Sequence, residues 1–142
     1  ANNIEVAEKL IADNTRRSFI EFKIPVQSFK GANPLIENDF RDLVDASNHP
    51  EIIVEIERRI LEYIDHSRNS AINFSLTIAG KTQGIRGEYI TKLRDESIIL
   101  SGNAEIRLSD FSISPPQKMF GMLQVKDIII IKFDILILGS NS

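Results

Sequence analysis

The chain has 142 residues, of which 42% are hydrophobic and 26% charged, which suits one globular domain over residues 1–142. Its net charge of −3 provides no basic footprint for phosphates, so no nucleic-acid partner is expected. The absence of cysteine excludes disulfides, thiolate catalysis and cysteine metal sites. No run of about 18 apolar residues occurs, so no membrane-spanning helix is expected.

The N-terminal segment fits two kinds of structure. Ile4, Ala7 and Leu10 follow helical spacing, whereas Ile4, Val6 and Leu10 also fit one face of a strand. The polar segment Asn14–Arg17 indicates a turn, and a hairpin there favours a strand before it.

The next segment, Ser18–Phe29, alternates regularly and predicts a half-buried strand. Ile20, Phe22 and Ile24 fall on one face and polar residues on the other. Pro25 has no N–H for a ladder, so it marks a sheet edge or a bulge.

One amphipathic helix is predicted over Pro34–Ala46. Asn33 is a suitable N-cap, and proline is favoured in the first helical turn. Ile36, Phe40 and Leu43 recur at helical spacing after it.

Further strands are predicted by alternation at Ile52–Ile60, Ile72–Ala79, Ile85–Leu93 and Ser97–Phe111. The polar segments Gly80–Gly84 and Lys92–Glu96 are predicted to be the turns between them. Two points stay open. Glu57–Ile64 fits either a helix or a longer strand, and Gly102 is compatible with a bulge.

The C-terminal segment Gly121–Leu138 is the most apolar and organises the rest. Ile129, Ile131 and Phe133 alternate with charged Lys132 and Asp134, yet both faces are apolar at the ends of the segment. Such a strand is typically central and covered on both sides. Pro115-Pro116 before it indicates an irregular connection.

Six to eight short strands with one helix predict an all-β domain, either a closed antiparallel barrel or a sandwich. Phe22, Phe74 and Phe133 fall on inward faces. They would either fill the core or line an apolar cavity, because barrels of about eight strands do both.

No catalytic or metal-binding constellation is recognisable. His49 and His66 lie in predicted turns without a third partner, and a surface turn is the simpler interpretation. The sequence Gly80-Lys81-Thr82 lacks the first glycine of a phosphate-binding loop, so it is interpreted as a hairpin turn. We therefore expect no enzyme activity, no metal and no cofactor.

Three segments in this order resemble the YceI-like family. They are NDFRDLVDASNHPEIIVE (Asn38–Glu55), LTIAGKTQGI (Leu76–Ile85) and IRLSDFSI (Ile106–Ile113). His49 stands where the family usually has tyrosine, Ala79 where it has histidine and Gln83 where it has lysine. The matching positions are Gly80, Thr82, Ser109, Asp110, Phe111 and Ile113.

Two further features of the resemblance concern the first half of the chain. Phe22–Phe29 is similar to the version of a Bacteroidetes-type branch, and the family's first segment is shortened or absent. A missing edge strand would leave an exposed ladder, for which homodimerisation is one remedy.

The resemblance implies an extended, lipocalin-like antiparallel β-barrel that holds a polyisoprenoid or similar amphiphile. It also implies a periplasmic or secreted location. The implied ligand-binding residues are those predicted to face inward: Ile20, Phe22, Ile24, Phe74, Leu76, Ile78, Ile106, Leu108, Ile129, Ile131 and Phe133.

Two functions therefore compete. One is carriage of a long apolar ligand inside the barrel, and the other is a non-catalytic interaction domain with a filled core. The second would use an exposed sheet edge near Pro25 or Gly121 as its partner surface.

Overall fold

The computed structural model describes residues 2–6, 10–12, 18–59, 70–95, 97–113 and 127–137. These residues form nine strands, the α-helix α1 and two 3₁₀ turns, η1 and η2. The strands are β1 (Asn2–Val6), β2 (Leu10–Ala12), β3 (Phe19–Pro25), β4 (Phe29–Lys30), β5 (Glu51–Glu57), β6 (Ser70–Ile78), β7 (Lys81–Arg94), β8 (Ser97–Arg107) and β9 (Ile128–Ile137). The other elements are η1 (Val26–Ser28), α1 (Pro34–Leu43) and η2 (Leu108–Phe111).

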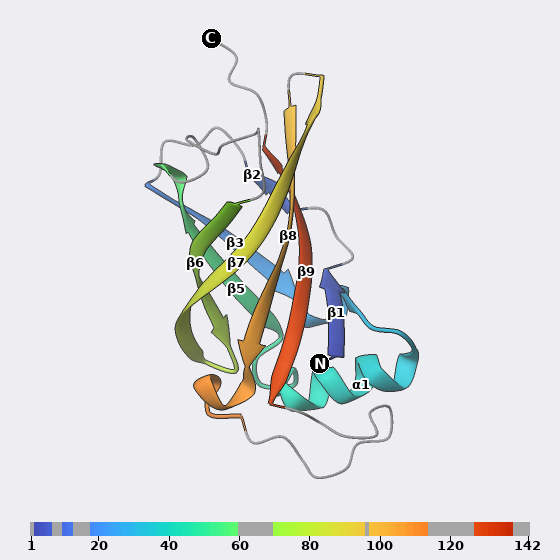
Figure 1. Ribbon diagram of the computed structural model, residues 1–142. Helices are drawn as coiled ribbons and strands as arrows, with labels where there is room; N and C mark the ends of the chain where they lie inside the picture. Colours follow the sequence, from blue (N-terminus) through green and yellow to red (C-terminus); the bar gives the residue numbers. More distant parts are fainter. Residues whose placement is uncertain are drawn as a thin grey trace.

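All nine strands belong to one sheet in the order β3-β5-β6-β7-β8-β9-β1-β4, with β2 paired to β9 (Figure 1). The two ends of this order, β3 and β4, are consecutive in the chain and separated only by η1. The sheet therefore curves until its first and last strands are both provided by the continuous segment β3–η1–β4. The predicted lipocalin-like, all-β barrel is confirmed.

The N-terminal residues form strands, as the hairpin interpretation favoured. Both strands run parallel to β9: Ile4 faces Ile131, and Leu10 faces Ile135. The other described pairings are antiparallel. Strand β1 therefore lies inside the sheet, between β9 and β4.

The predicted strand Ser18–Phe29 is interrupted. β3 ends at Pro25, and η1 turns the chain before β4 begins. Because β3 pairs with β5 alone among the described strands, Pro25 lies on an edge, as predicted.

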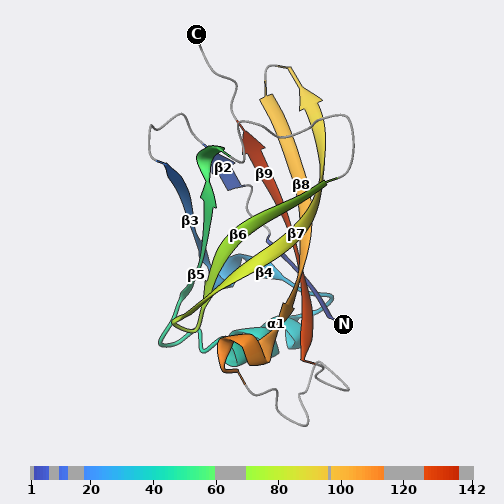
Figure 2. The same cartoon turned by 60° about the vertical axis from the view of Figure 1, so that its left-hand side comes forward.

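Helix α1 closes the lower end of the barrel (Figure 2). Asn33 caps it, with its side-chain oxygen accepting a hydrogen bond from the Ile36 N–H at 3.0 Å. Phe40 is buried and its ring lies 5.3 Å from that of Phe29, centroid to centroid. The helix ends at Leu43 rather than at the predicted Ala46, because a turn with Asp45 at φ 54° follows it.

Both predicted polar turns are shorter than expected. The turn between β6 and β7 consists of Ala79 and Gly80, and β7 already begins at Lys81. A hydrogen bond of 2.7 Å joins the hydroxyls of Thr77 and Thr82 across the two strands next to this turn. At the other end β7 continues to Arg94. Polar residues there are outward positions of a long hairpin, which composition alone does not distinguish from a turn.

Strand β8 also ends earlier than predicted, at Arg107, and the chain continues into η2. Asp127 fixes this turn, since its carboxylate accepts hydrogen bonds from the Ser109 N–H at 2.9 Å and the Ser109 hydroxyl at 2.7 Å. Gly102 forms no bulge, because the register with β7 and β9 runs through it.

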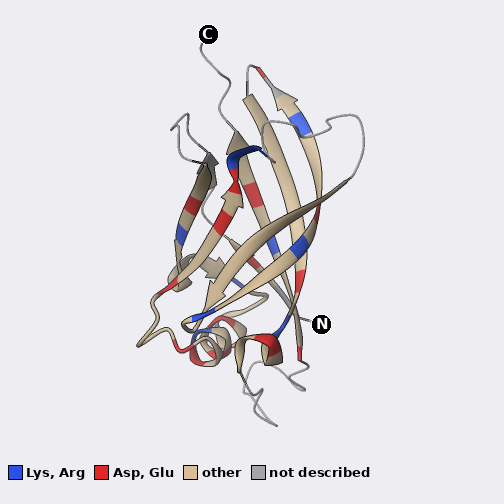
Figure 3. Cartoon of the chain, turned by 90° about the vertical axis from the view of Figure 1, so that its left-hand side faces the viewer, with Lys and Arg blue, Asp and Glu red and all other residues tan. Residues whose placement is uncertain are grey.

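Strand β9 is central, as predicted, with β8 on one side and β1 and β2 on the other. Residues Ile129, Ile131 and Ile135 are buried in a single core. Lys, Arg, Asp and Glu residues are interspersed along the strands and on α1 (Figure 3).

Several predictions fall outside the described residues. They concern the turn at Asn14–Arg17, the segment 60–64, His66, Pro115-Pro116 and the edge near Gly121.

Candidate functional site

Among the described residues, the side chains that line the space inside the barrel are all apolar. They come from β1, β2, β3, β4, β5, β6, β8 and β9, so most of the sheet contributes. The wall consists of Val6, Leu10, Ile24, Phe29, Ile52, Val54, Ile56, Phe74, Leu76, Ala104, Ile106, Ile131, Phe133 and Ile135. The free space between them is about 20 Å³, roughly the room that one water needs. In this conformation the interior is almost completely filled.

The eleven residues predicted to face inward are separated by the structure into two groups. Six lie on the interior wall: Ile24, Phe74, Leu76, Ile106, Ile131 and Phe133. The other five are buried in the same core but lie away from this space: Ile20, Phe22, Ile78, Leu108 and Ile129. Their role in ligand binding stays a prediction for both groups.

Eight wall residues were absent from the predicted ligand-binding set. Alternation in the predicted strands already placed Ile52, Val54, Ile56, Ala104 and Ile135 inward, so this signal was available. The wall positions of Val6, Leu10 and Phe29 are different, because they depend on how the N-terminal strands pair with β9 and β4. Periodicity carries no information on that pairing.

Two aromatic rings occupy the middle of the interior. Phe74 and Phe133 meet edge to face with centroids 6.0 Å apart. A Cβ on Gly102 would lie 2.7 Å from Cζ of Phe133, and one on Gly87 would lie 3.2 Å from Cε1 of Phe74. The two rings therefore use the space left by two glycines on neighbouring strands.

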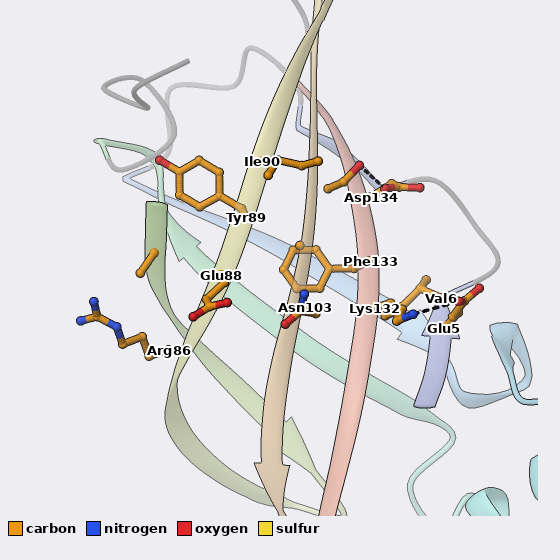
Figure 4. A pocket seen from close by; sticks show the side chains of 13 residues that line it. Glu5, Val6, Arg86, Glu88, Tyr89, Ile90, Asn103, Lys132, Phe133 and Asp134 are labelled. Atoms are coloured by element: carbon orange, nitrogen blue, oxygen red, sulfur yellow. Dashed lines mark hydrogen bonds and ion pairs between the residues drawn. The ribbon is translucent and has the colours of Figure 1, made fainter. Parts of the chain in front are cut away.

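A larger hollow of about 770 Å³ lies on the outer face of β7, β8 and β9 (Figure 4). Its lining includes charged side chains of both signs. Lys132 Nζ lies 4.0 Å from Glu5 Oε1, and the Ser101 hydroxyl donates a hydrogen bond to Asp134 Oδ1 at 2.6 Å. Pairs this exposed contribute little energy. No group of three or more His, Asp or Glu able to hold a metal occurs in the described part of the chain.

The segments that carry the family resemblance gather at the closed, lower end. Gln83 Nε2 donates to the Asp110 carbonyl at 2.8 Å, which ties β7 to η2. The imidazole of His49 packs on the β6–β7 turn, where a Cβ on Gly80 would lie 3.1 Å from its Cε1. His49 therefore has a packing role at the β6–β7 turn.

A family model described as a YceI-like domain matches residues 2–137. The chain belongs to the YceI-like family. The recognition made from three short segments is confirmed, whereas the Bacteroidetes-type branch stays a prediction. No functionally curated protein sequence matched the chain.

Solved structures of this YceI-like protein's relatives show the same fold. A Campylobacter jejuni YceI protein is 18% identical with a TM-score of 0.62, over 82% of this chain and 69% of the other. Burkholderia cenocepacia BcnA is 19% identical with a TM-score of 0.61, over 82% and 71%. At these identities the likeness concerns the fold alone. Among the described helices, none has the length and apolarity needed to cross a membrane.

Proposed function

We propose that this YceI-like protein binds a long apolar or amphipathic molecule, of the isoprenoid-lipid class, inside its barrel. The observation that carries the proposal is the interior wall, to which eight strands contribute side chains and no polar side chain among them. A wall of this kind gives affinity through burial of methylenes, at about 0.8 kcal/mol each. It offers nothing that would recognise a charged or strongly polar ligand.

Family membership supports the same function. The resemblance implies a lipocalin-like carrier of a polyisoprenoid or similar amphiphile, and the fold that it implied is present.

Binding requires the interior to expand. Ligand sites for small molecules usually measure about 300–1,000 Å³, whereas the free space here is about 20 Å³. A bound chain would therefore have to displace side chains such as Phe133, which is only half-buried.

The function is tested by extracting freshly purified protein with organic solvent and identifying lipids by mass spectrometry. We expect an apolar chain at close to one molecule per protein, or its uptake when isoprenoid alcohols are added to delipidated protein. Protein that emerges free of lipid and takes up none afterwards would contradict the proposal.

A second candidate is a non-catalytic interaction domain with a filled core. The small interior volume and the contact between Phe74 and Phe133 favour it directly. In that case the edge of β3 that pairs with no described strand, near Pro25, would be the partner surface. Ligand uptake distinguishes the two, since a protein that binds isoprenoid alcohols supports the carrier, and one that binds none but associates with a partner supports the interaction domain.

Two further proposals concern the setting of this function. We propose a periplasmic or secreted location, supported by the family resemblance, which cell fractionation of the native host would test. We also propose that the β3 edge pairs in a homodimer at high concentration, because unpaired ladders are usually covered. Sedimentation analysis over a concentration series would test it.

A further inference from the structure

The barrel consists of two parts that are joined by short ladders. The β3–β5 ribbon (Phe19–Pro25 and Glu51–Glu57) is held together by seven facing pairs. The larger sheet is more extensive, with nine facing pairs between β6 and β7, eight between β7 and β8 and ten between β8 and β9. By contrast, β5 meets β6 through three described pairs, and β4 meets β1 through two.

Both short ladders lie at the lower part of the ribbon. The β5–β6 ladder covers Ile53–Glu55, and the β1–β4 ladder lies beyond η1, at Phe29 and Lys30. Above them, the described residues Phe19 and Ile20 pair only with Glu57 and Ile56, inside the ribbon itself. The upper part of the ribbon therefore has no ladder to the larger sheet among the described residues.

The filled interior lies between these two parts. The ribbon and β4 provide Ile24, Ile52, Val54, Ile56 and Phe29, while the larger sheet and the N-terminal strands provide the rest of the wall. Separating the two parts would open this apolar space without breaking any of the long ladders.

We propose that the β3–β5 ribbon is a lid that swings away from β6 to admit the ligand into the barrel. This inference rests on the proposed function and adds the route by which the ligand enters. The described hydrogen bonds place the hinge at the lower end, where the Val26 N–H donates to the Pro50 carbonyl at 2.8 Å, and Phe29 packs on Phe40 of α1.

The ladders favour opening at the joint between β5 and β6. Local opening costs least where few backbone hydrogen bonds are lost. Swinging the ribbon out breaks the three-pair ladder to β6, whereas parting β8 from β9 would break ten facing pairs. The lower end is closed by α1, with Phe40 and Val44 buried beneath the strands.

The lid is tested with a disulfide that joins the ribbon to β6. Glu55 and Ser75 face each other on the outer side of the β5–β6 ladder, at its upper end. Facing residues of antiparallel strands lie about 4.5–5.5 Å apart at Cα, within the range of a disulfide. The double variant Glu55→Cys/Ser75→Cys introduces the only thiols, because the chain has no cysteine.

The matched control is Glu88→Cys/Asn103→Cys, a facing outward pair between β7 and β8 that lies within the larger sheet. The probe is retinol, an isoprenoid alcohol whose fluorescence rises on entering an apolar site. We expect oxidation of the Glu55→Cys/Ser75→Cys variant to slow uptake by about tenfold or more, since only the open state admits the probe. Reduction should restore the rate, and the control should be unaffected.

The outcomes separate the lid from the function. Equal uptake by the oxidised and reduced Glu55→Cys/Ser75→Cys variant overturns the lid and leaves ligand binding intact, as does equal slowing in the control. A native protein that takes up no retinol or other isoprenoid alcohol overturns the function itself.

Independently of any ligand, amide hydrogen exchange should be faster in the β5–β6 ladder than in β8 and β9, and equal protection would contradict the lid.

Discussion

At the scale of single residues, the interior depends on glycines that make room for aromatic rings. Gly102 faces Phe133 across the β8–β9 ladder, and the ring of Phe133 lies over the glycine. Gly84 also lies within a strand, yet no heavy atom is found within 4 Å of the position of its missing Cβ. Two glycines in similar backbone positions therefore have different reasons to be present.

Gly102→Ala is expected to destabilise the protein by about 1–3 kcal/mol, because the new methyl would overlap the Phe133 ring in a filled interior. Gly84→Ala is the control and is expected to be neutral or stabilising by up to about 1 kcal/mol. Chemical denaturation of both variants measures the difference. Equal effects would contradict the packing described for Phe133.

Phe133→Asp is expected to cost about 3–5 kcal/mol or to prevent folding, because it places an unpaired charge in the apolar interior. Lys132→Asp changes its exposed neighbour, whose nearest anionic partner is Glu5 at 4.0 Å, and should change stability by no more than about 1 kcal/mol. Thermal melts that give the opposite order would overturn the assignment of inner and outer faces.

Residue periodicity identified the inner face correctly in β3, β6, β8 and β9. Ten of the eleven predicted inward residues are buried, and the eleventh, Phe133, is half-buried. Alternation succeeds because one face of each strand packs on the core. It did not indicate that His49 would pack on the Gly80 turn, since β5 and β6 lie between these two segments in the sequence.

At the scale of elements, α1 functions as a closure. Its buried face includes Phe40 and Leu43, and its capping by Asn33 was predictable from sequence. The end of the helix was not, because the left-handed residue Asp45 carries no signal that distinguishes it from helical aspartates. Strand β7 was predicted too short, because polar outward residues near strand ends have the composition of turns. Strand β8 was predicted too long, because Leu108 continues the alternation of Ala104 and Ile106 into η2.

Phe40→Ala is expected to destabilise the protein by about 3–5 kcal/mol, because it removes a ring that is 1% exposed and packs on Phe29. Leu35→Ala, on the same helix but 53% exposed, should change stability by about 0.5 kcal/mol or less. Denaturant midpoints measure both. Similar effects for the two variants would show that α1 contributes through its helicity rather than through closure of the barrel.

At the scale of the whole molecule, the pairing of distant strands decides what the barrel contains. The parallel pairing of β1 and β2 with β9 joins the two ends of the chain, and no local pattern encodes such a contact. Whether the interior is hollow was equally out of reach, because it depends on the sum of side-chain volumes around a closed wall. The free volume inside the barrel is about 20 Å³. Ligand binding therefore depends on whether the wall can open.

The location of a bound chain is tested by removing ring volume at two places. Phe74→Leu enlarges the interior, because Phe74 lies on its wall, whereas Phe111→Leu removes the same volume from η2, away from the wall. Each variant is expected to lose about 1–3 kcal/mol without ligand. A ligand that binds the native state adds about 2.7 kcal/mol at one hundred times its Kd. With retinol present, the thermal midpoint should rise more for Phe74→Leu than for Phe111→Leu, because only Phe74→Leu gives the chain more room. Equal rises would place the ligand outside the barrel, in a region such as the outer hollow between Arg86 and Lys132.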